Sequence, residues 1–85
     1  MSKAKRTLEK VLTGKTDANV DFDDLCHLLH VLGFSERQKG SHHIFYRDGI
    51  DEIVNIQPLG RLAKRYQVRQ VRNIILKYKL GVSDE

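Results

Sequence analysis

The chain contains no tryptophan and only one cysteine, one proline and one methionine among its 85 residues. Cys26 cannot form a disulfide within the chain, which favours a reducing compartment. No apolar stretch approaches membrane-spanning length, and the N-terminal segment lacks the apolar run and cleavage-like site of a signal peptide. We therefore expect a cytoplasmic protein that makes no contact with a membrane.

The short length limits the chain to one small domain with a thin core. Apolar residues make up 40% of the sequence and are mostly leucine, isoleucine and valine, with three phenylalanines and three tyrosines as the bulky members. This is enough for one sheet with helices on one face.

Positive charge is unevenly distributed along the chain, whose formal net charge is +4. Residues 61–80 contain basic side chains and no acid, whereas acids gather at Asp17, Asp21, Asp23 and Asp24. The asymmetry suggests a cationic face for a polyanion. A solvated basic helix surface explains such a segment about equally often.

Apolar spacing predicts three helices. The first covers residues 4–13 and ends at Gly14, and the second begins after Asp21 as N-cap and ends at Gly33. The third covers residues 68–78 and turns its apolar positions inward. Residues 59–67 give no clear pattern.

Between the second and third helices, the period changes from helical to extended. Three short strands are expected at residues 34–37, 43–47 and 52–57, joined by turns at Lys39-Gly40-Ser41 and Asp48-Gly49. Strand side chains alternate, so His43 and Phe45 should share one face and His42 the other. The order predicts an α+β fold, a three-stranded antiparallel sheet with helices on one face and His42 on the open face.

His42 is the strongest candidate for a catalytic residue. It follows a tight basic turn and enters a strand, so its imidazole should be both held in place and accessible to water. Imidazole has an unperturbed pKa near neutrality, which suits proton transfer on an anionic substrate such as a phosphodiester. The 2′-hydroxyl of RNA could then attack the adjacent phosphorus. The general acid would be His43, a lysine or water, and the sequence does not select among them.

Other candidates surround this turn or lie in the basic C-terminal segment. Their expected roles are phosphate binding, close backbone approach, hydrogen bonding and secondary RNA contact. The candidate RNA-binding residues are Arg37, Lys39, Gly40, Ser41, His43, Arg47, Lys64, Arg65 and Arg69.

Two other kinds of site are less favoured. Asp23, His27 and His30 have a spacing that could hold a metal, but they fall on the expected polar face of a helix, and a solvated face explains them better. Cys26 lies in an apolar stripe, as a core residue rather than a nucleophile would. We expect no metal and no cofactor.

Several motifs resemble those of the HicA toxins of toxin–antitoxin modules. They are Leu32-Gly33-Phe34, Arg37-Gln38-Lys39-Gly40-Ser41-His42-His43-Ile44-Phe45, Ile53-Val54-Asn55-Ile56 and Val71-Arg72-Asn73-Ile74-Ile75. The resemblance implies a fold similar to the double-stranded-RNA-binding domain over residues 21–80, preceded by an added N-terminal helix and connector in residues 1–20 and followed by a tail, residues 81–85. The chain differs from many relatives at Gln57-Pro58-Leu59-Gly60-Arg61 and Lys64-Arg65-Tyr66-Gln67, where they have a proline-and-histidine loop and a Lys-Pro-Gly entry to the last helix.

The resemblance also implies a function. Such a toxin is a ribonuclease that cleaves messenger RNA to arrest translation, with the family's catalytic histidine at His42. A HicB-type antitoxin would be its partner, so that the chain is a monomer when free or part of a toxin–antitoxin hetero-oligomer. The alternative is a non-catalytic RNA-binding module, or a degenerate toxin acting as an interaction protein. His42 itself separates the two, because a pure phosphate binder would be better served by lysine or arginine there.

Overall fold

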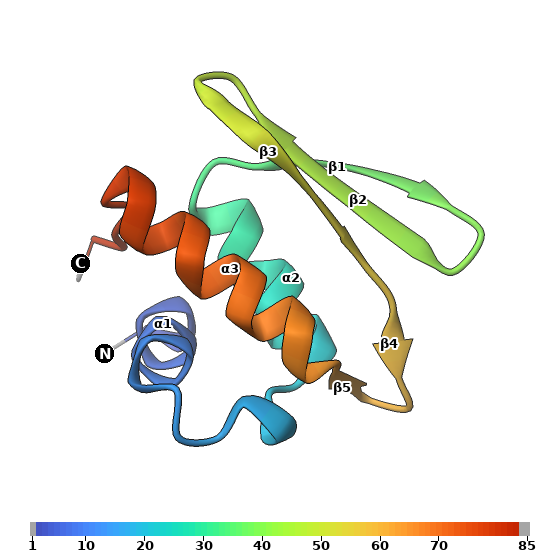
Figure 1. The fold of residues 1–85 in the computed structure, drawn as a ribbon, viewed down its shortest axis with the longest axis horizontal. Coiled ribbons are helices and arrows are strands. Elements are labelled where there is room, and N and C mark those ends of the chain that lie inside the picture. The colour runs from blue at the N-terminus through green and yellow to red at the C-terminus, as the bar shows by residue number, and fades with distance from the viewer. Residues whose placement is uncertain (1, 84–85) are drawn as a thin grey trace.

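Three α-helices and a three-stranded antiparallel sheet form most of the computed structural model, which describes residues 2–83 (Figure 1). The elements in chain order are α1 (Lys3–Thr13), η1 (Asp17–Asn19), α2 (Phe22–Val31), β1 (Ser35–Lys39), β2 (His42–Arg47), β3 (Ile50–Ile56), β4 (Pro58–Leu59), β5 (Leu62–Ala63) and α3 (Arg65–Tyr78). The predicted α+β fold, similar to the double-stranded-RNA-binding domain, is confirmed.

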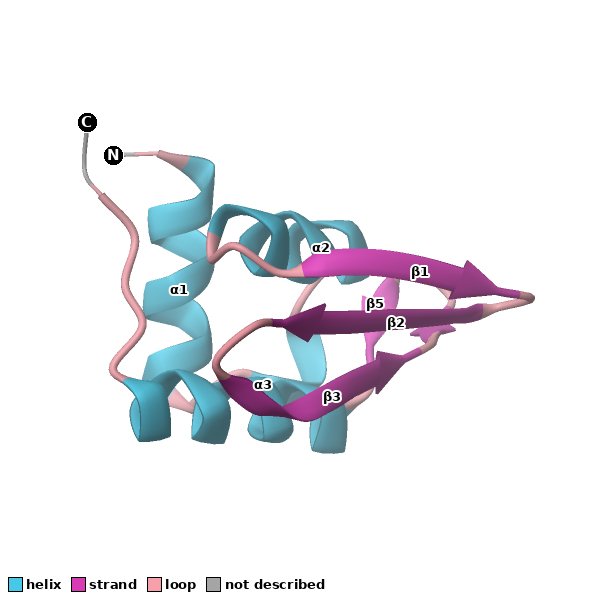
Figure 2. Ribbon diagram, turned by 90° about the horizontal axis from the view of Figure 1, so that it is seen from above, coloured by secondary structure: helices cyan, strands magenta, loops and turns pink. Residues whose placement is uncertain are grey.

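The main sheet has the order β1-β2-β3, with β2 in the centre. Helices α2 and α3 lie on one face of the sheet, under β1 and β3, while α1 crosses near one end (Figure 2). No helix of residues 2–83 lies on the opposite face, as predicted. None of the helices in residues 2–83 is long and apolar enough to cross a membrane.

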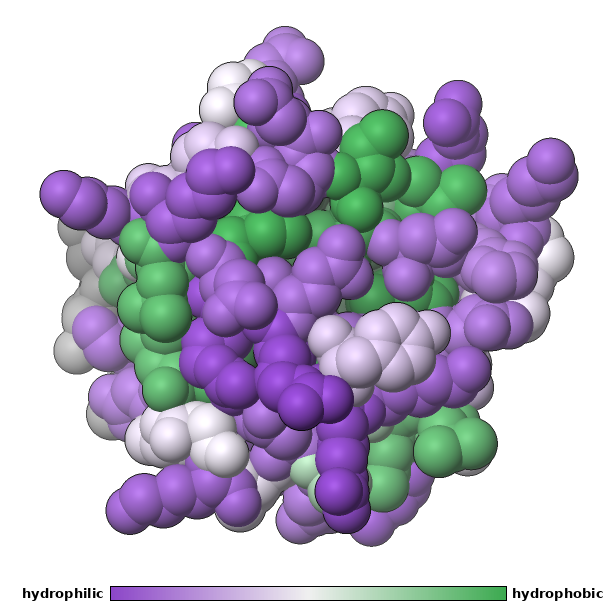
Figure 3. Space-filling model, viewed as in Figure 1, coloured by the Kyte–Doolittle hydropathy of each residue, from purple (hydrophilic) through white to green (hydrophobic). Residues whose placement is uncertain are grey.

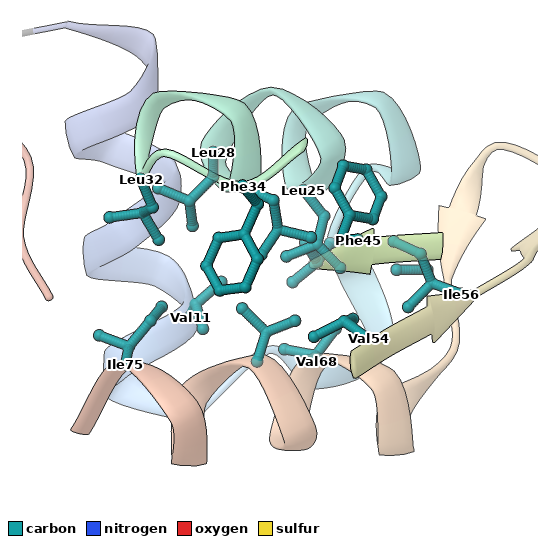
Figure 4. Close-up of a cluster of buried hydrophobic side chains, with 14 of the residues drawn as sticks. Val11, Leu25, Leu28, Leu32, Phe34, Phe45, Val54, Ile56, Val68 and Ile75 are labelled. Carbon is teal, nitrogen blue, oxygen red and sulfur yellow. The ribbon is translucent and has the colours of Figure 1, made fainter. Parts of the chain in front are cut away.

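One hydrophobic core joins the covered face of the sheet to all three helices. Phe45, at the centre of β2, is fully buried and turns its ring toward α2, with Val54 and Ile56 of β3 beside it (Figure 4). Helix α1 adds Ala4, Leu8 and Val11 to the same cluster. Of the predicted tail, Val82 also packs against the core, whereas residues 84 and 85 lie outside the described residues.

The helix boundaries follow from local capping. The predicted N-cap at Asp21 is confirmed, because its side chain accepts a hydrogen bond of 3.1 Å from the backbone N–H of Asp24. Helix α3 begins at Arg65, three residues before the predicted start. The side chain of Gln67 reaches back and accepts a hydrogen bond from the backbone N–H of Lys64. This capping contact starts the helix although the N-cap residue is a lysine and not a serine, threonine or aspartate.

An ion pair with little exposure attaches the N-terminal segment to α3. One guanidinium nitrogen of Arg72, Nη1, donates to Oδ1 of Asp17 at 2.9 Å and to the carbonyl oxygen of Val11 at 3.1 Å. The side chains are 18% and 15% exposed. Gly14 ends α1 with φ +69°, and a Cβ at this position would lie only 3.2 Å from the same nitrogen. Glycine therefore suits both the backbone and the close approach of Arg72. The guanidinium group of Arg72 therefore adds a polar link to the apolar packing of α1 and α3.

Replacing Arg72 by methionine should destabilise the protein by about 2 kcal/mol, because Asp17 and the carbonyl of Val11 lose a charged donor while partly buried. Arg69→Met is the matched control, since Arg69 is exposed on the same helix, and should change stability by less than about 0.5 kcal/mol. Urea unfolding of both variants measures the difference, and equal losses would contradict the role given to Arg72.

Candidate active site

A two-residue turn places His42 at the start of β2. Lys39 and His42 are paired across β1 and β2, so Gly40 and Ser41 alone form the loop. Gly40 has φ +60°, and a positive φ at the first loop residue is what a type II′ hairpin turn requires. The side chain of Gln38 closes the turn by donating to the carbonyl oxygen of Gly40 at 3.2 Å.

Two amide side chains at the end of β3 contact this turn. Nδ1 of His42 lies 3.0 Å from Oδ1 of Asn55, and Nε2 of Gln57 donates to Oγ of Ser41 at 2.9 Å. Asn55 pairs with Ile44 in the ladder and is therefore the diagonal neighbour of His42. His42 is exposed, yet its ring is held by a neighbouring strand.

The open face of the sheet brings His42 together with two cations. Lys39 is opposite His42, and Arg37 is opposite Ile44, two residues further along β2 on the same face. Both cations are exposed. Tyr46, with 43% of its surface exposed, lies on this face as well. The open face therefore offers an imidazole, positive charge and an aromatic ring to one ligand.

His43 faces the opposite way, as predicted, and is held by Glu36. Its Nδ1 lies 2.6 Å from Oε2 of Glu36, and its ring packs edge-on against Phe22 with centroids 4.9 Å apart. The other oxygen of Glu36 lies 2.7 Å from Nε2 of His30. Partial burial opposes ionisation of Glu36, but the hydrogen bonds to His43 and His30 outweigh it and lower the pKa of the carboxyl. His43 thus contributes to packing between β2 and α2.

Arg47 is also separated from His42. It lies at the other end of β2, where its Nη1 donates to the carbonyl oxygen of Leu32 at 2.9 Å. The guanidinium group packs beside Gly33, at the end of α2. Arg47 therefore closes the C-terminal end of that helix, and the structure does not bring it to the turn.

The predicted cations of α3 form a second group. Lys64 precedes the first residue of the helix, and Arg65 and Arg69 line a hollow of about 550 Å³ together with residues 14–19. Helix α3 packs under the covered face of the sheet, so these cations and His42 lie on different faces (Figure 2). In Figure 3 the surface over α3 is mostly hydrophilic and is interrupted by separate apolar patches.

The structure gives no support to Cys26 as a nucleophile or to a metal site at Asp23, His27 and His30. Burial, together with the nearby carboxylates of Glu36 and Asp23, raises the pKa of the Cys26 thiol to about 12, so the reactive thiolate is disfavoured. Over residues 2–83, no group of three His, Cys, Asp or Glu side chains is arranged to hold a metal ion. His30 contacts Glu36 instead of completing a metal site with Asp23 and His27.

Neither Asn55 nor Gln57 was predicted from the sequence to be a site residue. Both follow from the pairing register, because residues that alternate with the buried Val54 and Ile56 must lie on the open face. A polar amide that alternates with buried residues could have indicated a residue of the open face. The contact of Asn55 with His42 could be predicted only with the register between β2 and β3, and a bulge between Phe45 and Arg47 shifts that register.

A family model assigns the fold and its turn to a known group of proteins. The model described as HicA toxin of bacterial toxin–antitoxin matches residues 22–78, which include α2, the whole sheet and α3. No curated protein and no solved structure matches the chain. The match covers more than half of the 85 residues and contains the turn that carries His42. The chain therefore belongs to the HicA toxin family of bacterial toxin–antitoxin systems.

Proposed function

We propose that this protein is an endoribonuclease that cleaves messenger RNA in the cytoplasm and so arrests translation, with His42 as its proton-transfer group. The observation that carries the proposal is an exposed imidazole, held at a two-residue turn beside Lys39 on an uncovered sheet face. A toxin of this family has an antitoxin as its partner. RNA as substrate agrees with the excess of positive charge, because a polyanion is attracted to such a surface.

The proposed reaction is an attack within the RNA chain. His42 removes the proton of a 2′-hydroxyl, the 2′-oxygen forms a bond to the adjacent phosphorus, and the bond from phosphorus to the 5′-oxygen breaks. The products are a 2′,3′-cyclic phosphate and a 5′-hydroxyl, whose proton comes from Lys39 or from water. His43 is not used, because it contacts Glu36 on the covered face. Lys39 and Arg37 stabilise charge on the phosphate oxygens.

The proposed RNA site has two parts. The turn, through Gly40 and Ser41, and the cations of β1 hold the scissile phosphate. Beyond the sheet, Lys64, Arg65 and Arg69 hold further phosphates of the same strand. In both ribbon views the start of α3 lies toward the same end of the molecule as the turn, so one RNA strand can follow both parts (Figures 1 and 2).

The antitoxin in this proposal is a HicB-type protein that covers the open face. Masking His42 and its neighbouring cations would block catalysis and RNA binding together. The toxin is then a monomer when free and a subunit of a hetero-oligomer when inhibited.

Changing His42 to alanine should abolish RNA cleavage and growth arrest, while the free energy of unfolding changes by less than about 0.5 kcal/mol because the imidazole is exposed. His27→Ala removes an exposed histidine from α2 and serves as the matched control, with activity expected to stay at the parental rate. Cleavage assays on purified protein decide the outcome. If His42→Ala cleaves RNA at a rate near that of the parent, the assignment is wrong. Retained RNA binding without any cleavage by the parent would favour the binding-module alternative.

The cations of α3 are tested by the salt dependence of RNA binding. The double variant Arg65→Gln/Arg69→Gln should bind RNA more weakly and should reduce the slope of log K against log salt concentration by about 1.4, since each single-strand phosphate contact contributes about 0.7. Arg6→Gln/Lys10→Gln makes the same change of charge on exposed positions of α1 and should leave the slope unchanged. Equal slopes for the parent and the α3 variant would place the RNA elsewhere.

A further inference from the structure

We propose that Asn55 and Gln57, the two amides at the end of β3, are positioning residues that set the hydrogen-bonding state of His42 and Ser41. The inference rests on the proposed function, but it concerns groups that the family assignment does not specify. Each amide contacts one polar group of the turn, at 3.0 Å and 2.9 Å. Asn55 leaves His42 with a free acceptor nitrogen, and Gln57 leaves Ser41 with a free donor hydrogen. Both groups lie on the open face.

Asn55 determines which imidazole nitrogen of His42 is free. Its Oδ1 is a carbonyl oxygen and can only accept, so the hydrogen bond at 3.0 Å requires a hydrogen on Nδ1 of His42. The neutral ring then keeps its lone pair on Nε2, the nitrogen that Asn55 does not contact. A general base needs this lone pair directed at the substrate, and a fixed tautomer keeps it there.

Gln57 determines the direction of the Ser41 hydroxyl. Its Nε2 is a donor, so the hydrogen bond at 2.9 Å occupies a lone pair on Oγ of Ser41. The hydrogen of the hydroxyl is therefore left to point elsewhere. On the open face beside Lys39, the available acceptor would be a phosphate oxygen of bound RNA. Gln57 thus keeps Ser41 as a donor to the substrate.

The neutrality of both amides suits a polyanionic substrate. A carboxylate at residue 55 would also accept from Nδ1 of His42, but it would add a negative charge close to the phosphate. It would also stabilise the protonated imidazole, which is not a base. The charged group opposite His42 is Lys39 on β1, with Arg37 two residues away on the same face, and residue 55 on β3 is uncharged. Substitutions at residue 55 therefore change the group beside His42 while the cations of β1 stay the same.

The tautomer of His42 can be measured in the free protein by the ¹⁵N chemical shifts of its ring. We expect Nδ1–H in the parent and in Asn55→Asp, which keeps an acceptor oxygen, and a mixture of tautomers in Asn55→Ala. Asn73→Ala makes the same change at an exposed position of α3 and should give the parental spectrum. A parent ring protonated on Nε2, with Nδ1 accepting from the amide nitrogen of Asn55, would overturn the proposal.

Cleavage kinetics test the consequence of that geometry. Asn55→Ala should lower kcat by about tenfold to a hundredfold, a part of the 10² to 10⁴-fold that proton transfer typically contributes, with KM little changed. A parental kcat in Asn55→Ala would overturn the role of Asn55.

Gln57 is tested by reversing its hydrogen bond. In Gln57→Glu a carboxylate accepts the hydroxyl hydrogen of Ser41, so this variant should lose RNA affinity beyond the effect of the added charge. The same change in a Ser41→Ala background measures the charge effect alone. Equal losses in the two backgrounds would overturn the role of Gln57.

Failure of the proposed function has a different signature. If His42→Ala still cleaves RNA, catalysis by His42 is wrong, whereas the ¹⁵N shifts still decide whether Asn55 fixes its tautomer. If His42→Ala is inactive and Asn55→Ala has the parental shifts and rate, only the positioning role is wrong.

Discussion

Alternation of side chains along β2 is the constraint on which the site depends, because it sends two adjacent histidines to opposite faces of one sheet. His43 turns toward α2, where Glu36 and Phe22 hold it. That contact and the buried Phe45 fix the strand, so His42 is held without being buried. A shift of register by one residue would exchange the two imidazoles and bury the proposed base.

Stability and proposed chemistry are therefore carried by different faces. The covered face holds the core, the carboxylate of Glu36 and the guanidinium of Arg47, each with a partner inside the protein. The open face holds groups with unused hydrogen-bonding capacity, namely the imidazole of His42 and the cations of β1. Because exposed side chains contribute little to folding, the open face can be altered at small cost in stability.

Much of this arrangement could be predicted from residues alone. The caps at Gly14 and Asp21, the glycine turns and the alternation through Phe45 gave the three helices, the three strands and the faces of both histidines. The early start of α3 and the β4–β5 hairpin were missed, since a reciprocal contact of Gln67 with Lys64 and a two-residue strand pair leave weak local patterns. Arg47 was predicted to bind RNA, and its contact with Leu32 was not foreseen, because it spans 15 residues of sequence. The contact of Asn55 with His42 spans 13 residues and was missed for the same reason.

The chemical nature of the RNA ends tests the central claim most directly. RNA cleaved by the purified protein in excess EDTA should yield fragments that end in 2′,3′-cyclic phosphate or its hydrolysis product, a 3′-phosphate, since in the proposed reaction His42 activates the 2′-hydroxyl of the RNA itself. Mass spectrometry identifies these ends. Fragments with 3′-hydroxyl ends, together with loss of activity in the chelator, would show that a metal-activated water makes the attack and would contradict the role of His42 as general base.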